Sequence, residues 1–453
     1  MEREILEKAK KIHCIGIGGI GLSAIARMML HEGREVSGSD GADSELLCEL
    51  RKEGVSISIG HDGKNVPSEC DLVVYSVAIR PDNPELAEAK KHTIPLLTYP
   101  EALGYISREK KTIAISGTHG KTTTTAMTAK ILIDAGLAPT VIVGSLMEDP
   151  RNQSIDYGAK KKWTNFISGS GKYLIVEADE YRRAFLNLEP FILGINNIDE
   201  DHLDYYKDLS DIQDAFRSLV SKVPRDGFVV TDTKNPHITP VLPSVNAPVL
   251  HYPDFVIDEW KLRVPGLHNR KNAQVAGTIA SELGISREVI QKSLESFEGA
   301  WRRFEYKGRT ARGALVYDDY AHNPPKVRAA LAALREKFPN KKGIVVFQPH
   351  LYSRTKQHMA DFRESFADAD YVILAPIFAA REAYDPTISS KMLGEAIQKI
   401  FSNMHDTKRE VFSLASHDAI VEKINSITTS DQYVIMTVGA GDIYLLGEKL
   451  VKK

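Results

Sequence analysis

The stretch IAISGTHGKTTTTAM (residues 113–127) decides the fold, because it joins an apolar strand-like run to a helix-forming segment through a glycine turn. The turn reads GxxGKT, with isoleucine in place of the first glycine of the longer GxxxxGK[ST] pattern. We expect Gly117 and Gly120 to shape it, Lys121 to reach nucleotide phosphates and Thr122 to offer its hydroxyl to Mg²⁺. The alternative is a glycine turn capped by threonines. The sequence favours a phosphate loop.

A second glycine turn, GIGGIG (residues 16–21), lies about a hundred residues earlier in the chain. Gly16, Gly18 and Gly21 have the GxGxxG spacing, after an apolar run and before the helical pattern LSAIARMML. Glycines let backbone N–H groups approach a diphosphate, and the helix N-terminus adds partial positive charge. Asp40 stands where an acid often meets a ribose hydroxyl. The alternatives are a dinucleotide, another diphosphate, or a plain strand-to-helix turn.

Two acidic segments follow the phosphate loop. YLIVEADEYRRAF (residues 173–185) ends an apolar run in Glu177, Asp179 and Glu180, and acids at a strand tip beside a phosphate loop are well placed to hold Mg²⁺. NNIDEDHLDYY (residues 196–206) adds His202 as a candidate metal ligand. The acids around that histidine are Asp199, Glu200, Asp201 and Asp204. An isolated acidic loop is otherwise a solvated structural feature.

Composition limits the class of protein. The chain has 453 residues, 43% hydrophobic and 26% charged, a net charge of -2, and no apolar run approaching the ~18 residues of a membrane span. We expect a cytoplasmic chain without an export signal, with small-molecule partners, no nucleic acid and no membrane. Cys14, Cys48 and Cys70 contain no CxxC pair, which argues against a disulfide framework or a zinc knuckle.

Strand-like runs alternate with helical patterns along the whole chain, which predicts an α/β protein. Its length exceeds the ~250–300 residues at which one core usually splits. We predict an N-terminal Rossmann-like domain over residues 1–109, a central P-loop ATPase-type domain over 110–304 and a C-terminal Rossmann-like domain over 305–453. Two phosphate-binding loops in one chain indicate a ligase, which must hold an activated donor and an acceptor together. The sequence leaves monomer or homodimer open.

The motifs together resemble the Mur ligases of peptidoglycan synthesis over nearly the whole length. The resemblance rests on HCIGIGGIGLSAIA, SGSD, SGTHGKTTTTAM, EADE, NNIDEDHLDYY, GLHNRKNAQVA, RRFEY, DDYAHNP, FQPHLYSRT and GAGD. It implies a UDP-substrate domain, a central ATPase domain and an amino-acid domain that closes over the site. The implied activity is ATP- and Mg²⁺-dependent ligation of L-alanine to the lactyl carboxylate of UDP-N-acetylmuramate through an acyl phosphate.

The resemblance also implies roles for individual residues. The catalytic residues would be Lys121, Glu177, His202, His322 and Arg354. The metal would be held by Thr122, Glu177 and His202. ATP would be held by Gly117, Thr118, His119, Gly120, Lys121, Thr122, Thr123, His268, Asn269, Asn272, Arg303 and Asp318. The UDP-sugar and the amino acid would be held by Gly18, Gly19, Ile20, Gly21, Ser39, Asp40, His350, Tyr352 and Arg354.

Some positions depart from the alanine-adding pattern. Asn323 and Leu351 stand where a histidine and an arginine are frequent, and Tyr181 follows EADE where serine is usual. A tyrosine at this position resembles the sequence of the related recycling ligase, which attaches a murein tripeptide. That activity is the alternative function. Other classes are an oxidoreductase with an NAD site at GIGGIG, a folylpolyglutamate synthase, and a non-catalytic nucleotide sensor. An oxidoreductase would leave the phosphate loop unexplained. A folylpolyglutamate synthase lacks the N-terminal GxGxxG domain. A nucleotide sensor needs no cluster of arginine and histidine in the C-terminal domain.

Overall fold

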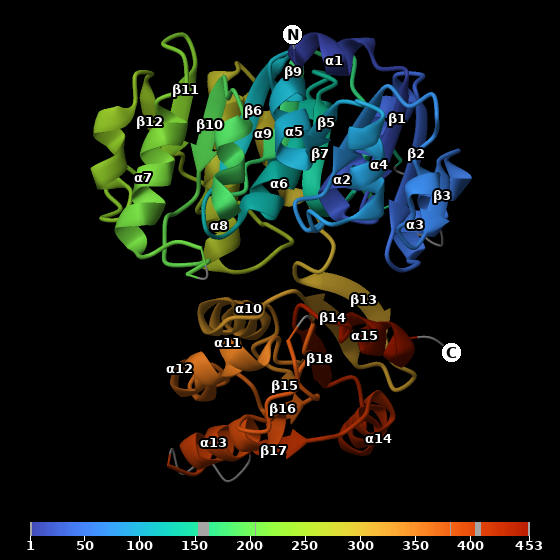
Figure 1. The fold of residues 1–453 in the computed structure, drawn as a ribbon. Helices are drawn as coiled ribbons and strands as arrows, with labels where there is room; N and C mark the ends of the chain where they lie inside the picture. Colours follow the sequence, from blue (N-terminus) through green and yellow to red (C-terminus); the bar gives the residue numbers. More distant parts are fainter. Residues whose placement is uncertain (1, 153–162, 204, 381, 404–408, 452–453) are drawn as a thin grey trace. The chain divides into compact units, whose positions relative to one another are not determined.

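The computed structural model of the chain describes residues 2–152, 163–203, 205–380, 382–403 and 409–451 (Figure 1). Contacts divide the chain into two compact units. The first unit contains Met1–Lys261 and Lys271–Phe297, and the second contains Leu262–Arg270 and Glu298–Lys453. Three β-sheets are present in the described part, two of them in the first unit.

The N-terminal sheet is parallel and has the order β3-β2-β1-β4-β5 (Figure 1). Its strands are β1 (Lys11–Ile15), β2 (Glu35–Asp40), β3 (Ser56–Ile59), β4 (Leu72–Tyr75) and β5 (Leu96–Thr98). The helices of this region are α1 (Glu2–Lys8), α2 (Ile20–His31), α3 (Glu45–Lys52), α4 (Pro84–Lys91) and α5 (Tyr99–Ser107). Ile15 of β1 is opposite Ser39 of β2, so the glycine turn that follows β1 lies at the same sheet edge as Asp40.

The central sheet has the order β12-β11-β10-β6-β9-β7-β8 and is parallel except for the β7–β8 pair. Its strands are β6 (Lys111–Ser116), β7 (Thr140–Glu148), β8 (Trp163–Ile167), β9 (Tyr173–Glu177), β10 (Ile192–Ile195), β11 (Phe228–Thr231) and β12 (Val249–His251). The helices are α6 (Lys121–Asp134), α7 (Leu209–Val220), α8 (Leu267–Glu282) and α9 (Arg287–Glu295). Because β6 lies between β9 and β10, the phosphate turn, the EADE acids and the NN pair emerge at one edge.

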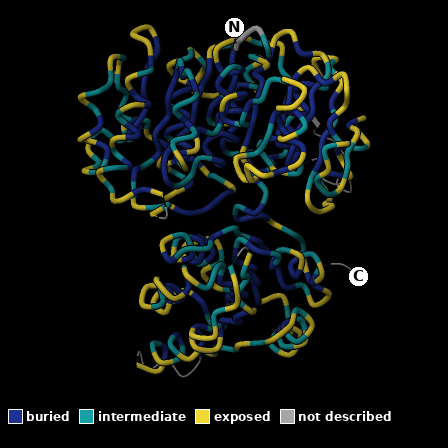
Figure 2. The backbone as a smooth tube through the Cα atoms, viewed as in Figure 1, coloured by how far each residue is buried: buried dark blue, intermediate teal, exposed yellow. Residues whose placement is uncertain are grey.

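One continuous hydrophobic core joins these two sheets, which explains why they form a single unit. It contains Ile25 and Met29 of α2, and Phe166 and Val176 of the central sheet, all buried. Figure 2 shows the buried segments of the backbone in dark blue. Helix α2 packs against β7 and β8. Burial of this apolar surface stabilises the arrangement of the two sheets.

The sheet of the second unit has the order β13-β14-β18-β15-β16-β17, with only the β13–β14 pair antiparallel among its described strands. Its strands are β13 (Glu305–Arg309), β14 (Leu315–Asp319), β15 (Lys342–Phe347), β16 (Tyr371–Leu374), β17 (Glu410–Ser413) and β18 (Tyr433–Val438). Alternate residues of β15 face opposite layers, since Val345 packs with one cluster and Ile344 with another. The first cluster includes α10 (Pro324–Lys337), α12 (Met359–Arg363) and α13 (Ser390–Asn403), and the second α14 (His417–Ile427) and α15 (Tyr444–Val451).

The predicted fold class is confirmed: the chain is an α/β protein of three domains with parallel or mostly parallel sheets, the middle one with a phosphate-type loop. The domain limits at residues 109/110 and 304/305 stay predictions. Cys14, Cys48 and Cys70 are free thiols, and the first and last of them are buried. Among the described helices, none is long and apolar enough to cross a bilayer.

Candidate active site

The turn between β6 and α6 depends on two glycines in the left-handed region. Gly117 has φ +124° and Gly120 has φ +83°. A Cβ atom on Gly120 would lie 2.3 Å from the Oδ1 of Asn272, and one on Gly117 would lie 2.9 Å from the Asn197 carbonyl oxygen. Gly120 is also the N-cap of α6 and has no side chain to accept the first-turn amides. The turn therefore presents backbone donors at a helix N-terminus, the arrangement that binds phosphate.

Two asparagines at the end of β10 hold this turn in shape. Asn197 Oδ1 accepts a hydrogen bond from the His119 amide at 2.8 Å, and Asn196 Nδ2 donates to the His119 carbonyl at 3.0 Å. Asp199 and Thr118 add a reciprocal pair, in which the Asp199 amide donates to the Thr118 hydroxyl at 2.8 Å. The sequence analysis used the acids of NNIDED and missed the role of its asparagines. The only sequence feature that could have indicated this role is the NN pair directly after an apolar strand.

Lys121, the first residue of α6, lies inside the site and is paired with an acid. Its Nζ donates to the Gly117 carbonyl at 2.8 Å and to Glu180 Oε2 at 2.7 Å. Burial alone lowers the pKa of Lys121, but the carboxylates of Glu180, Asp179 and Glu177 outweigh it and raise the pKa, so the amine is a cation. Glu180, a member of EADE, is 2% exposed. Its pairing with the phosphate-loop lysine was not predicted.

A group of potential metal ligands adjoins this pair. Ligand atoms of Asp179, Glu180 and His202 lie within 4.8 Å of one another. Glu177 is not in that group, but its Oε2 would be 2.6 Å from a Cβ on Gly144 of β7, which places it at the same edge of the central sheet. Thr122 and Thr123 are buried in the first turn of α6. Asp204 lies outside the described residues.

Three residues around these ligands have a strained backbone. Arg182, Arg183 and His202 are non-glycine residues with φ between +51° and +57°. The Tyr181 ring lies 4.7 Å from the His202 ring, and the Arg183 guanidinium donates to Asp211 Oδ1 at 2.6 Å. Strained residues that neighbouring contacts hold in place are common at functional sites. The segment after EADE is therefore a fixed wall of the site.

The N-terminal glycine turn is contacted by a carboxylate, whereas the phosphate turn is contacted by a lysine. Gly18 donates its amide to Asp40 Oδ2 at 2.8 Å, and the amides of Gly16 and Ile17 donate to the Ser39 carbonyl at 2.8 and 3.0 Å. Gly16 has φ +80°. Gly19, the N-cap of α2, is exposed. Gly18, Gly19, Ile20, Gly21 and Asp40 are thus brought together, whereas the Ser39 side chain is fully buried below them.

The second unit gathers the predicted amino-acid residues at the ends of β14 and β15. The rings of His322 and His350 lie 6.3 Å apart, and Arg354 approaches His350 Nδ1 at 3.2 Å. The His350 ring is stacked on Phe378 at 5.7 Å. Tyr352 begins α11 (Tyr352–Gln357) and meets the exposed ring of Tyr384 edge-on at 5.8 Å.

The predicted adenine contacts are distributed along the chain. Asn272 is in the first unit, where its Oδ1 accepts from Asn196 at 3.4 Å. His268 and Asn269 belong to the second unit, and Asn269 Nδ2 donates to the Pro265 carbonyl at 2.7 Å. These roles remain predictions.

Asp318 and Arg303 occupy different environments within the second unit. Asp318 is fully buried, and its carboxylate accepts from Arg302 at 3.0 Å and from Thr437. Burial raises the pKa of Asp318, and Arg302 opposes that shift. Arg303 is partly exposed, with its guanidinium 4.6 Å from the centre of the Tyr320 ring. Arg302, the buried partner, was missed because RRFEY does not distinguish its two arginines.

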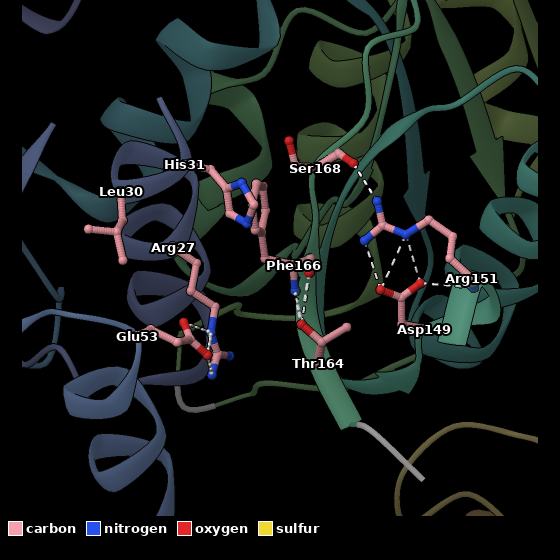
Figure 3. A pocket seen from close by; sticks show the side chains of 9 residues that line it. All are labelled: Arg27, Leu30, His31, Glu53, Asp149, Arg151, Thr164, Phe166 and Ser168. Carbon is pink, nitrogen blue, oxygen red and sulfur yellow. Dashed lines mark hydrogen bonds and ion pairs between the residues drawn. The ribbon is translucent and has the colours of Figure 1, made fainter. Parts of the chain in front are cut away.

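A separate cavity of about 460 Å³ lies between α2, the end of α3 and the β7–β8 hairpin (Figure 3). It contains none of the predicted site residues. Arg27 pairs with Glu53 at 2.9 Å, Arg151 pairs with Asp149 at 2.7 Å, and His31 faces Phe166 at 5.7 Å. The other lining residues are Leu30, Thr164 and Ser168.

Comparisons with known proteins identify the family. Residues 11–111 match the Mur ligase family catalytic domain, residues 115–254 the Mur ligase middle domain, and residues 302–441 the Mur ligase glutamate ligase domain. The chain is 38% identical to the UDP-N-acetylmuramate--L-alanine ligase of Clostridium beijerinckii, with 99% of each chain covered.

Solved structures agree with this assignment. The UDP-N-acetylmuramate-alanine ligase of Thermotoga maritima has a TM-score of 0.77 and 28% identity, covering 97% of this chain and 98% of that one. A murein peptide ligase from Psychrobacter arcticus has a TM-score of 0.66 at 22% identity, covering 97% and 98%, and shares the fold. With three domain matches in order and a full-length relative of this identity, the chain belongs to the Mur ligase family.

Proposed function

We propose that this protein ligates L-alanine to the lactyl carboxylate of UDP-N-acetylmuramate, using ATP and forming ADP and phosphate. The observation that carries the proposal is the similarity over 99% of the chain to a relative with that name. The geometry supports it, because the phosphate turn and the acid group lie at one edge of the central sheet. This ligation is a step of peptidoglycan precursor synthesis.

The phosphate turn is assigned to ATP. Amides at the start of α6 would receive the phosphates, and the Lys121 ammonium would neutralise charge on the γ-phosphoryl group as the carboxylate attacks it. The same part of the proposed ATP site includes Thr118, His119, Thr122 and Thr123. The turn is rigid because Asn196 and Asn197 fix it, so little reorganisation is needed when ATP binds.

Asp179, Glu180 and His202 fit a divalent cation, because two carboxylates and an imidazole converge within 4.8 Å. We propose that they hold Mg²⁺ together with Glu177 and Thr122. The ion would supply charge neutralisation for the phosphoryl group. Glu180 is shared between this group and Lys121, which balances the local charge.

The remaining residues are assigned to the other two substrates. The turn of Gly18, Gly19, Ile20 and Gly21 would receive the diphosphate of the UDP-sugar, and Asp40 its ribose side. In the second unit, Arg354 would bind the carboxylate of the amino acid in a fork, with His322, His350 and Tyr352 around it. The amine would then displace phosphate from the acyl phosphate through a tetrahedral intermediate.

His268, Asn269, Arg303 and Asp318 are assigned to the nucleotide side of ATP by the family resemblance. Because the reaction consumes ATP and a nucleotide sugar, we place it in the cytoplasm. Monomer and homodimer are both compatible with the proposal.

Phosphate release measured with ATP, Mg²⁺ and UDP-N-acetylmuramate tests the function. L-alanine, glycine, L-serine and the murein tripeptide L-alanyl-γ-D-glutamyl-meso-diaminopimelate are compared as acceptors. Release that depends on L-alanine supports the proposal. Release only with the tripeptide contradicts it and assigns the chain to peptide recycling, with Tyr181 and Arg182 as the residues to test.

A further inference from the structure

A buried carboxylate beneath the N-terminal glycine turn has no role in the chemistry described above. Glu85, near the start of α4, is 0% exposed. Its Oε2 lies 2.6 Å from the Ser39 hydroxyl and 2.9 Å from His13 Nε2. Its Oε1 lies 3.1 Å from His61 Nδ1 and 3.0 Å from Asn65 Nδ2. One carboxylate thus joins side chains from β1, from β2 and from the segment after β3.

This group is one contact away from the residues assigned to the UDP-sugar. Ser39, whose hydroxyl meets Glu85, accepts the amides of Gly16 and Ile17 with its carbonyl. The next residue, Asp40, accepts the Gly18 amide with its side-chain Oδ2 at 2.8 Å and the Gly60 amide with its backbone carbonyl at 2.8 Å. His61 follows Gly60 directly in the chain. The position of the β2 end, and with it the shape of the turn, depends on how Glu85 holds Ser39.

The protonation of the group follows from its contacts. Burial alone raises the pKa of Glu85, but the hydrogen bonds from His13, Ser39, Asn65 and His61 outweigh it and bring the pKa to about 2. An ionised carboxylate only accepts hydrogen bonds, so the nitrogen of His61 that faces it must carry a proton. That nitrogen is Nδ1. In the neutral imidazole, Nε2 then has the lone pair and is an acceptor.

The His61 side chain is also the part of the group that reaches solvent. It is 25% exposed, whereas the side chains of His13 and Glu85 are 1% and 0% exposed. An acceptor nitrogen at this edge suits a ligand group that carries a proton, such as an imide N–H of a base or a ribose hydroxyl.

We propose that Glu85 is a positioning residue for the nucleoside end of the UDP-sugar: it anchors Ser39 beneath the glycine turn and keeps His61 in the Nδ1–H tautomer. The inference rests on the proposed function for the identity of the ligand. The tautomer and the anchoring of Ser39 are properties of the protein alone, and they are tested without turnover.

The test compares Glu85→Gln with Glu88→Gln. Glu88 is on the same helix, where its carboxylate contacts Lys91 and His92 at the surface. A glutamine keeps the shape of Glu85 but replaces one acceptor oxygen by an NH₂ donor, which faces groups that also donate. We expect Glu85→Gln to weaken UDP binding, measured by calorimetry, and to raise KM for UDP-N-acetylmuramate by about tenfold, the size expected for a charged hydrogen bond. KM for ATP and kcat should stay within twofold, and Glu88→Gln should resemble the wild type.

Nitrogen-15 NMR of the wild-type imidazoles at pH 8 provides the second readout. We expect His61 to carry its proton on Nδ1 in the wild type, and a mixed or Nε2–H form in Glu85→Gln. A wild-type His61 protonated at Nε2 would overturn the proposal, even if the glutamine variant failed to fold. So would unchanged UDP binding in a folded Glu85→Gln, or equal losses for UDP and ATP. A wild-type protein that binds UDP but does not ligate L-alanine would refute the proposed function and leave this inference standing.

Discussion

The two glycine turns of this protein have the same backbone plan and opposite chemical partners. Each follows a central strand of a parallel or mostly parallel sheet and precedes a helix whose N-cap is a glycine, Gly19 for α2 and Gly120 for α6. In the first turn the nearest charged group is the Asp40 carboxylate, which accepts the Gly18 amide. In the second it is the Lys121 ammonium, which donates to the Gly117 carbonyl.

The difference teaches which part of such a motif specifies its ligand. Glycines make room and free the amides, and they do so in both turns. The added side chain decides the rest: a carboxylate suits hydroxyl donors beside a diphosphate, whereas a lysine suits a phosphoryl group that gains negative charge. Substitutions in each turn, and acid, test this contrast.

Removal of the lysine should have the largest effect. We expect Lys121→Met to lower kcat at least 1000-fold, roughly 4 kcal/mol of transition-state stabilisation, because the variant lacks the ammonium proposed to neutralise charge on the γ-phosphoryl group. Steady-state phosphate release measures the effect. Lys130→Met is the matched control, since Lys130 is on the same helix and pairs only with Asp134 in the hydrogen bonds described.

Loss of Lys121 also leaves the buried Glu180 without its cation, so low activity could reflect unfolding. The double variant Lys121→Met/Glu180→Gln removes both charges. It should regain the stability that the single variant loses in urea unfolding while remaining inactive. Activity in the double variant would show that the lysine is structural.

The sequence predicted the elements that are continuous in the chain. Both turns and the strand-end acids follow from short local patterns. The α/β class follows from the alternation of such patterns along the chain, and the structure confirms it. The partners that fix the site could not be predicted in this way. Asn196, Glu85 and Arg302 act on residues far away in sequence, and each looks ordinary in its own segment. Only the strand order of the sheets brings them into contact.

Acid should destabilise the first unit through the group beneath the first turn. The pKa of Glu85 is about 2 in the folded protein, below its value near 4.5 when unfolded. A depressed carboxyl pKa stabilises the fold at pH above the unfolded value, and this contribution is lost as pH falls from 4.5 to 2. The shift corresponds to about 3 kcal/mol. Urea unfolding at pH 6 and pH 3 should show a smaller loss for Glu85→Gln than for the wild type. An equal loss would contradict the prediction.

Addition of a methyl group to the N-cap glycine should affect the phosphate turn more than the N-terminal turn. Gly120→Ala places a Cβ 2.3 Å from Asn272 Oδ1 at a positive φ, whereas Gly19→Ala meets its nearest atom at 3.2 Å. We expect Gly120→Ala to lower the free energy of unfolding by about 2 kcal/mol and to raise KM for ATP. Gly136→Ala is the control, because Gly136 has φ +76° and open space around its Cβ position. Gly136→Ala measures the cost of a positive φ alone. If it lowered the free energy of unfolding as much as Gly120→Ala does, the clash with Asn272 would be ruled out as the cause.

Asp40 provides the smallest and most selective test of the contrast. Asp40→Ala removes the acceptor of the Gly18 amide and the proposed partner of the ribose, but leaves the phosphate turn intact. We expect KM for UDP-N-acetylmuramate to rise about tenfold, near 1.4 kcal/mol, with little change in KM for ATP. Asp43→Ala is the matched control, since the exposed Asp43 pairs with Arg51 on the surface of the same domain. An unchanged KM for the UDP-sugar would remove Asp40 from the binding site and leave it only its structural contact with the Gly18 amide.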